Sequence, residues 1–132
     1  PHCDAPKMPP MRQDTPPNAN LFVAMGDAQP AYAEGTAIEV ADGEGLSYSW
    51  RDLDRATARL ANLLNALNLP PGSRVAAHTG KSVEALMLYL AVLRAGWVYV
   101  PLNPAYQAGE MAHFIRDAEP AVVGCSPPDL GW

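Results

Sequence analysis

The four residues Thr79-Gly80-Lys81-Ser82 have the composition of a phosphate-binding loop, and they lie between an expected strand and an expected helix. Such a loop needs this setting, because its backbone N–H groups and the start of the helix must face the phosphates. It also needs a glycine five residues before the Gly-Lys pair, so that the chain can wrap around the anion. Val75 occupies that position, inside the expected strand. We therefore interpret Ser82 as a helix N-cap and Lys81 as a solvated side chain.

The histidines give no pattern typical of a reactive or metal-binding site. His78 ends the expected strand, at the edge where open α/β sheets bind ligands, but no carboxylate or second ligand lies near it in the sequence. His113 lies on an expected helix, three residues after Glu110, and no His/Cys/Asp cluster has metal-ligand spacing. A Gly-x-Ser-x-Gly motif and a paired set of carboxylates are also missing. We predict no catalytic, cofactor-binding or metal-binding residue in this chain.

Composition and charge are those of an ordinary globular protein of one small domain. The 132 residues are 48% hydrophobic and 17% charged, with a net charge of −5. Basic residues are scattered rather than clustered, which argues against nucleic acid as a partner, and no apolar run is long enough to predict a membrane span. Cys3 lies in a Pro-rich segment and Cys125 ends an apolar run, so we predict no disulfide, a buried Cys125 and a cytoplasmic location.

The first half of the chain divides into a tail, a hairpin and a long helix. Residues 1–19 hold six of the fourteen prolines, so we predict a disordered tail there and a partial α/β subdomain over residues 20–132. A short helix is expected within residues 21–33, and a β-hairpin over residues 37–48 with its turn at 42–45. Ser49 and Asp52 form a capping-box variant at the start of the next helix. Its expected apolar face consists of Leu53, Ala56, Leu60, Leu63, Leu64 and Leu67.

The second half alternates between strand and helix patterns. Strands are expected at residues 74–78, 97–100 and 121–125, with helices at 83–94 and 110–117 between them. Ser82 is the expected N-cap of the first of these helices and Gly96 its C-terminal cap, and Leu86, Leu90 and Leu93 define its expected apolar side. This βαβαβ order implies parallel strands joined by right-handed crossovers. The predicted fold is therefore α/β, an incomplete doubly wound parallel sheet preceded by a β-hairpin and a helix.

Two segments carry a family resemblance. The segment from Leu46 to Leu53 (Leu-Ser-Tyr-Ser-Trp-Arg-Asp-Leu) resembles the early Leu-Thr-Tyr-x-Glu-Leu motif of adenylate-forming enzymes of the acyl-CoA synthetase superfamily. The segment from Leu93 to Asn103 (Leu-Arg-Ala-Gly-Trp-Val-Tyr-Val-Pro-Leu-Asn) resembles their second core motif. Within that superfamily, residues 18–22, 74–86 and 117–120 resemble malonyl-CoA synthetases in particular. The resemblance covers residues 18–127 and departs from the family pattern at residues 50–52 and at Trp97.

The resemblance implies a parent enzyme that is larger than this chain. Such a ligase uses ATP, Mg²⁺ and CoA. The carboxylate of the acid, here malonate, attacks the α-phosphate of ATP and releases pyrophosphate, which leaves an acyl-adenylate. The CoA thiol then displaces AMP from this acyl-adenylate. The family's phosphate loop, its adenine-binding segment and its catalytic lysine have no counterpart in this sequence, so no functional residue is carried over. The resemblance thus implies an inactive N-terminal part whose partner is the C-terminal remainder of the ligase.

Two other classes of function are compatible with the residues themselves. One is a stand-alone binding module for a small anion or nucleotide, built on Thr79–Ser82 and the strand ends. The other is an interaction fragment that pairs in trans with a separately encoded remainder. In either the ligase or the interaction class, we expect the isolated chain to expose apolar surface that the remainder covers.

Overall fold

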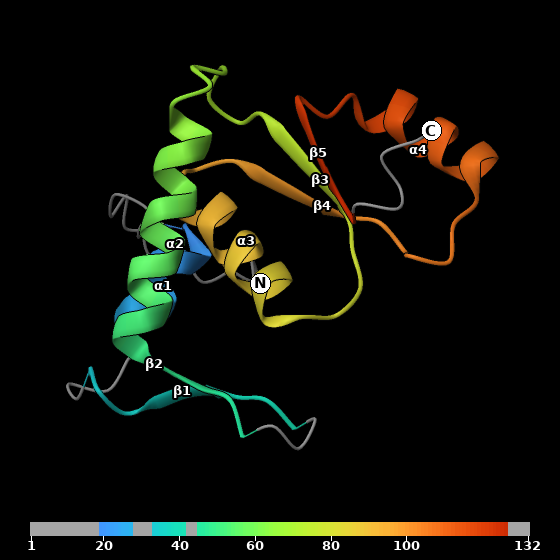
Figure 1. Ribbon diagram of the computed structural model, residues 1–132. Coiled ribbons are helices and arrows are strands. Elements are labelled where there is room, and N and C mark those ends of the chain that lie inside the picture. Colours follow the sequence, from blue (N-terminus) through green and yellow to red (C-terminus); the bar gives the residue numbers. More distant parts are fainter. Residues whose placement is uncertain (1–18, 28–32, 42–44, 127–132) are drawn as a thin grey trace, which may run out of the picture.

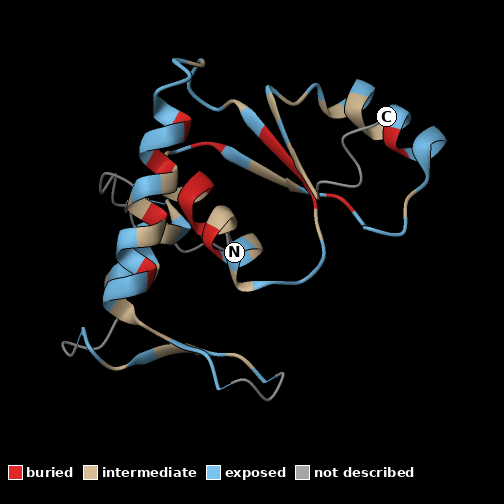
Figure 2. Ribbon diagram, in the orientation of Figure 1, coloured by how far each residue is buried: buried red, intermediate tan, exposed pale blue. Residues whose placement is uncertain are grey.

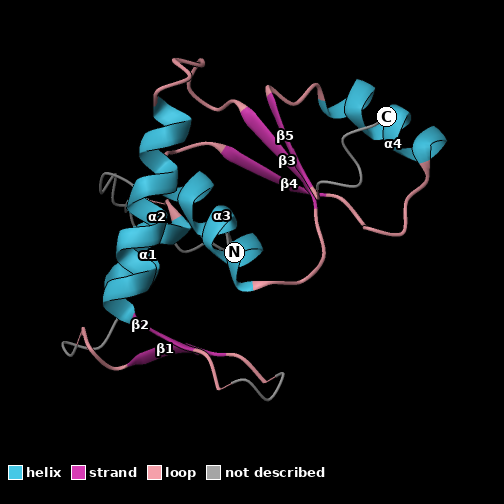
Figure 3. Ribbon diagram, viewed as in Figure 1, coloured by secondary structure: helices cyan, strands magenta, loops and turns pink. Residues whose placement is uncertain are grey.

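The computed structural model describes residues 19–27, 33–41 and 45–126, whose helices and strands are coloured in Figure 3. Of the predicted disordered tail (residues 1–19) only Ala19 is described, and of the predicted hairpin turn (residues 42–45) only Gly45 is described. Nine elements follow one another in the described part, and their order matches the predicted one (Figure 1). None of the described helices combines the length and the apolar character that crossing a membrane would require.

A three-stranded parallel sheet forms the centre of the molecule. Its strands are β3 (Arg74–His78), β4 (Val98–Pro101) and β5 (Val122–Cys125), and the spatial order is β4-β3-β5. Helix α3 (Val83–Arg94) connects β3 to β4, and α4 (Ala108–Ala118) connects β4 to β5. The first connection runs from the central strand to the edge strand β4, the second runs back across the sheet from β4 to β5, and α3 and α4 lie on opposite faces of the sheet (Figure 1). The predicted doubly wound α/β fold is confirmed.

The predicted apolar face of α2 (Trp50–Asn65) is only partly correct. Its capping box is present: the Ser49 hydroxyl accepts from the Asp52 N–H at 3.1 Å, and the Asp52 carboxylate accepts from the Ser49 N–H at 3.0 Å. The buried positions, however, are Leu53, Thr57, Ala61 and Leu64. Leu63, 63% exposed, lies about 100° around the helix from the buried stripe, and Leu67, 49% exposed, follows the last residue of α2.

Helix α3 lies against both the sheet and α2. As in α2, the residues that are buried are not all those of the predicted apolar side. Met87, Leu90, Ala91 and Val92 are buried, whereas Leu86, which was predicted to face inward, is 42% exposed. The helix ends in a Schellman motif: Gly96 has φ +76°, its N–H donates to the Leu93 carbonyl, and the Trp97 N–H donates to the Val92 carbonyl. Gly96 is therefore the predicted C-terminal cap, and it turns the chain directly into β4.

The antiparallel hairpin and the short first helix pack at one end of α2 and α3. Strand β1 (Thr36–Glu39) pairs with β2 (Ser47–Ser49), as predicted, and α1 (Leu21–Asp27) confirms the expected short helix. Their half-buried apolar residues surround a cluster formed by Leu53, Met87 and Leu90. Figure 1 shows this hairpin well away from the parallel sheet, with which it shares no strand pairing among the described residues.

The buried residues form a separate cluster on each face of the sheet (Figure 2). On the α2–α3 face, Trp97 and Val75 pack with Leu64 and Val92. On the other face, Met111 of α4 packs with Ala76 and Leu102. Helix α4 begins two residues earlier than the predicted Glu110, because the Glu110 carboxylate accepts the N–H of Gln107 at 3.0 Å and thereby caps an earlier start.

Candidate functional site

The carboxyl ends of β3 and β4 border a hollow of about 380 Å³. The helix that follows β3 and the helix that follows β4 lie on opposite faces, so this is the topological switch point of the sheet. Open α/β sheets bind ligands at such points. We call this depression the carboxyl-edge hollow; its lining is Ala77, Thr79, Gly80, Lys81, Ser82, Ala85, Leu86, Tyr89, Tyr99, Pro101 and Leu102.

The walls of the carboxyl-edge hollow are mainly apolar and aromatic. Tyr89 and Tyr99 meet edge to face with ring centroids 5.1 Å apart. Burial raises the pKa of Tyr99 above its usual value of 10.0, and the neighbouring Tyr89 raises this pKa further. Tyr99 therefore stays neutral at physiological pH. Leu86 projects from α3 with 42% of its surface exposed, and Lys81 is the charged residue of the lining.

Two backbone N–H groups at the start of α3, those of Glu84 and Ala85, already have acceptors within the chain. The Ser82 hydroxyl accepts the N–H of Ala85 at 3.1 Å, which confirms its predicted N-cap role. Hydrogen bonds from the backbone N–H of Glu84 and from the Ser82 hydroxyl lower the pKa of the Glu84 carboxyl from its usual 4.5. A carboxylate thus occupies the positive end of the helix that a phosphate-binding loop would offer to its ligand. Lys81 is exposed beside it, as predicted.

The histidines and Cys125 are spread over different parts of the fold. His78 is buried, 4% exposed, at the end of the central strand, where it lies in register with Cys125 of β5. Cys125 is a free thiol and is half-buried rather than buried as predicted, because β5 is an edge strand. His113 lies on the exposed side of α4 with its ring 5.6 Å from that of Phe114. Within the described ranges, no group of three or more His, Cys, Asp or Glu residues could hold a metal ion.

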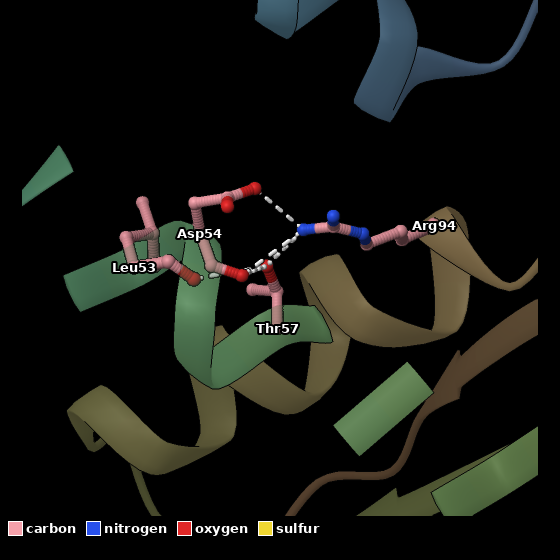
Figure 4. A network of polar contacts seen from close by, with 4 residues as sticks. All are labelled: Leu53, Asp54, Thr57 and Arg94. Atoms are coloured by element: carbon pink, nitrogen blue, oxygen red, sulfur yellow. Dashed lines mark hydrogen bonds and ion pairs between the residues drawn. The ribbon is translucent and has the colours of Figure 1, made fainter. Parts of the chain in front are cut away.

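A polar cluster that the sequence analysis missed joins α2 to α3 (Figure 4), and a contact of Arg94 with Phe22 adds α1. Arg94 Nη1 donates to the Asp54 carbonyl at 3.0 Å, to Asp54 Oδ1 at 2.7 Å and to Thr57 Oγ1 at 3.1 Å. The Thr57 hydroxyl is fully buried and donates to the carbonyls of Leu53 and Asp54. On its other side, the Arg94 guanidinium lies 5.0 Å from the centre of the Phe22 ring in α1.

The two motif segments of the sequence fall on adjacent structural units. Residues 46–53 form β2 and the first turn of α2, and residues 93–103 form the end of α3, the Schellman turn and β4. The family described as AMP-binding enzyme matches residues 27–129. This match includes both motif segments and all three strands of the parallel sheet. The chain belongs to the AMP-binding enzyme family.

Solved structures and curated proteins of this family agree with the fold. MatB from Rhodopseudomonas palustris, a malonyl-CoA synthetase, is 50% identical with a TM-score of 0.77, and the match covers 84% of this chain and 22% of MatB. A fatty acyl CoA synthetase from Mycobacterium tuberculosis is 28% identical with a TM-score of 0.61, covering 65% of this chain and 17% of that one.

Among curated proteins, the phosphinothricin tripeptide synthetase PhsC of Streptomyces viridochromogenes is 32% identical over 107 residues. That match covers 81% of this chain and 10% of the synthetase. The syringomycin synthase SyrB1 of Pseudomonas syringae is also 32% identical, and 17% of it is covered. The chain thus resembles one limited part of several much longer adenylate-forming proteins.

Proposed function

We propose that this chain is the N-terminal scaffold of an ATP-dependent acid–CoA ligase that acts on malonate. The observation that carries this proposal is the 50% identity to R. palustris MatB over 84% of the chain. The identity to the peptide synthetases is 32%, which favours a MatB-like acid ligase over an amino-acid-activating module. Three segments resemble malonyl-CoA synthetases, at residues 18–22, 74–86 and 117–120, and the last two lie within the sheet and its connections.

In this proposal the chain contributes architecture rather than reacting groups. The overall reaction converts a carboxylate, ATP and CoA into an acyl-CoA, AMP and pyrophosphate through an acyl-adenylate. We assign none of the described residues to ATP, Mg²⁺ or CoA, since the helix start beside the carboxyl-edge hollow is capped by Ser82 and Glu84. The described strands and helices provide a sheet with a hydrophobic cluster on each face, against which the rest of the ligase packs. The ligase acts in the cytoplasm.

A chimera tests this function directly. Residues 20–126 of this chain replace the equivalent stretch of R. palustris MatB, and AMP formation is measured with ATP, Mg²⁺, CoA and either malonate or acetate. We expect malonate-dependent AMP formation by the chimera and none by the isolated chain. A well-folded chimera that binds ATP but forms no AMP with malonate contradicts the scaffold role. The acid is tested on the full-length ligase that contains this chain, where a preference for acetate over malonate would contradict the proposal.

A further inference from the structure

Helix α1 is short and shallowly packed. Its 7 residues fall well short of the roughly 12 to 15 at which an isolated helix becomes even marginally stable in water, so its helical form depends on docking. None of the described residues 21–26 is buried: Phe22 and Met25 are half-buried against apolar residues of α2 and α3. Leu21 and Val23 are 48% and 40% exposed. A segment packed in this way opens locally at a much lower free energy than the whole domain unfolds.

Asn20 joins the start of α1 to the end of α3. Its Oδ1 accepts the N–H of Phe22 at 2.9 Å, which is the bond of an N-cap residue. Its Nδ2 donates to the carbonyl of Leu93 at 2.7 Å, across 73 positions of sequence. One carboxamide therefore fixes the first turn of α1 and, at the same time, attaches it to the last turn of α3.

The Leu93 carbonyl also belongs to the turn that leads into β4. It accepts the N–H of Gly96 at 3.0 Å in the Schellman motif, so Asn20 and Gly96 donate to the same oxygen. From this turn β4 continues to Tyr99, which lies in the lining of the carboxyl-edge hollow. A change at Asn20 therefore reaches the beginning of β4 through one shared acceptor.

Arg94 keeps the end of α3 attached to α2 independently of α1. Its Nη1 bonds to Asp54 and to Thr57 both lie on the α2 side, whereas its contact with the Phe22 ring requires α1 to be docked. Release of α1 thus removes one neighbour from the end of α3 and leaves the other in place. The arrangement permits α1 to open while the parallel sheet and the α2–α3 pair stay folded.

We infer that Asn20 and α1 form a clasp, which docks and releases as a unit and, when docked, tightens the turn from α3 into β4. In the released state the Leu93 carbonyl loses the Asn20 donor, and the apolar surface under Phe22 and Met25 becomes exposed to water. This conformational device goes beyond the scaffold role and does not depend on the acid that the ligase activates.

Hydrogen exchange measured by mass spectrometry on the full-length protein that contains this chain tests the clasp. Asn20→Ser keeps a hydroxyl that can cap α1, but this side chain lacks the amide donor and is too short to reach Leu93. We expect exchange to become about fivefold faster in residues 20–27 and also in residues 93–98, and to stay unchanged in residues 74–78 of β3.

Asn62→Ser is the matched control, because Asn62 is exposed on α2 and the two residue types differ little in helix propensity. It should leave the exchange of all three segments unchanged. Faster exchange in residues 20–27 alone overturns the inference, since α1 would then open without any effect on the turn. Equal acceleration in β3 overturns it as well, because the change would then be a global loss of stability. So does an Asn20→Ser protein that exchanges like the wild type or like the control.

The clasp and the ligase assignment fail in different experiments. Hydrogen exchange that contradicts the clasp leaves malonate-dependent AMP formation untouched as evidence for the proposed function. A protein that forms no AMP with malonate would overturn the ligase assignment, while the coupled exchange of residues 20–27 and 93–98 would still support the clasp.

Discussion

Arg94 forms a joint between three helices through contacts that lysine cannot reproduce. Its side chain is 30% exposed and reaches two acceptors on Asp54, the Thr57 hydroxyl and the face of Phe22. Lysine retains the charge and the donors, but its ammonium lacks the planar group that lies over the Phe22 ring, and it is a compact point charge. We expect Arg94→Lys to lower the free energy of unfolding by about 1 kcal/mol.

Urea unfolding followed by tryptophan fluorescence measures this change. Arg59→Lys is the matched control, because Arg59 is an exposed residue of α2, and it should shift the midpoint negligibly. A loss of stability as large for the control as for Arg94→Lys would show that the joint adds nothing beyond charge.

The charge of Asp52 makes the stability of the start of α2 depend on pH. Hydrogen bonds from the Ser49 side chain and backbone lower the pKa of the Asp52 carboxyl from its usual 3.8, and the nearby Arg55 and Arg51 add to this effect. Because the folded-state pKa is depressed, the stabilisation is present above the unfolded pKa and disappears as the pH falls through the folded pKa. Asp52→Asn should therefore be less stable than the wild type near neutral pH, and this difference should shrink as the pH falls below 3.8 and disappear once the pH is below the lowered folded-state pKa. A difference between the two curves that does not change with pH would contradict this account.

At the scale of elements, the turn from α3 into β4 depends on the left-handed conformation of Gly96. An added Cβ would meet no atom within 4 Å, so the effect of Gly96→Ala is one of backbone conformation alone. We expect this substitution to cost about 1 kcal/mol or more. Gly109→Ala is the matched control: it also meets open space but lies in α4 without a positive φ, and it should be neutral or stabilising by about 0.5 kcal/mol. Equal effects of the two substitutions in urea unfolding would disprove the conformational explanation.

The sequence predicted the order and type of the elements because the signals for them are local. The capping roles of Ser49, Ser82 and Gly96 follow from the types of the residues next to them in the sequence, and all three act as the predicted caps. The inward face of each helix is set by tertiary packing instead. Leu63 and Leu86 fit a helical period, but the faces that meet the sheet and the neighbouring helix are centred on other residues.

The candidate site was predictable in position but not in its components. His78 and Thr79–Ser82 mark the carboxyl end of β3 in the sequence, and the structure places the hollow there. Tyr89 and Tyr99 come together only through the fold, ten residues apart on α3 and β4. The Arg94–Asp54 contact spans forty residues, and no local pattern relates the two side chains.

At the scale of the whole molecule, the two outer strands of the parallel sheet each pair with a single strand among the described residues, and several large apolar side chains there are exposed. Strands β4 and β5 are the edges, and Val98 and Val123 on them are 46% and 44% exposed. We therefore expect the isolated chain to bind a hydrophobic dye and to associate with itself at micromolar concentration. The chimera, in which the remainder of MatB is present, should do neither. A monomeric isolated chain with a sharp cooperative melt and no dye binding would contradict this expectation.

The scaffold role of the chain is tested most directly by malonate-dependent AMP formation of the chimera carrying Lys81→Ala. Lys81 is the exposed lysine of the sequence that resembles a phosphate-binding loop, and a true phosphate site would depend on it. If the chain supplies architecture alone, kcat/KM for ATP and for malonate should stay within about twofold of the unsubstituted chimera. A loss of about a hundredfold in kcat/KM for ATP, with the fold intact, would contradict the account and place the nucleotide at Thr79–Ser82.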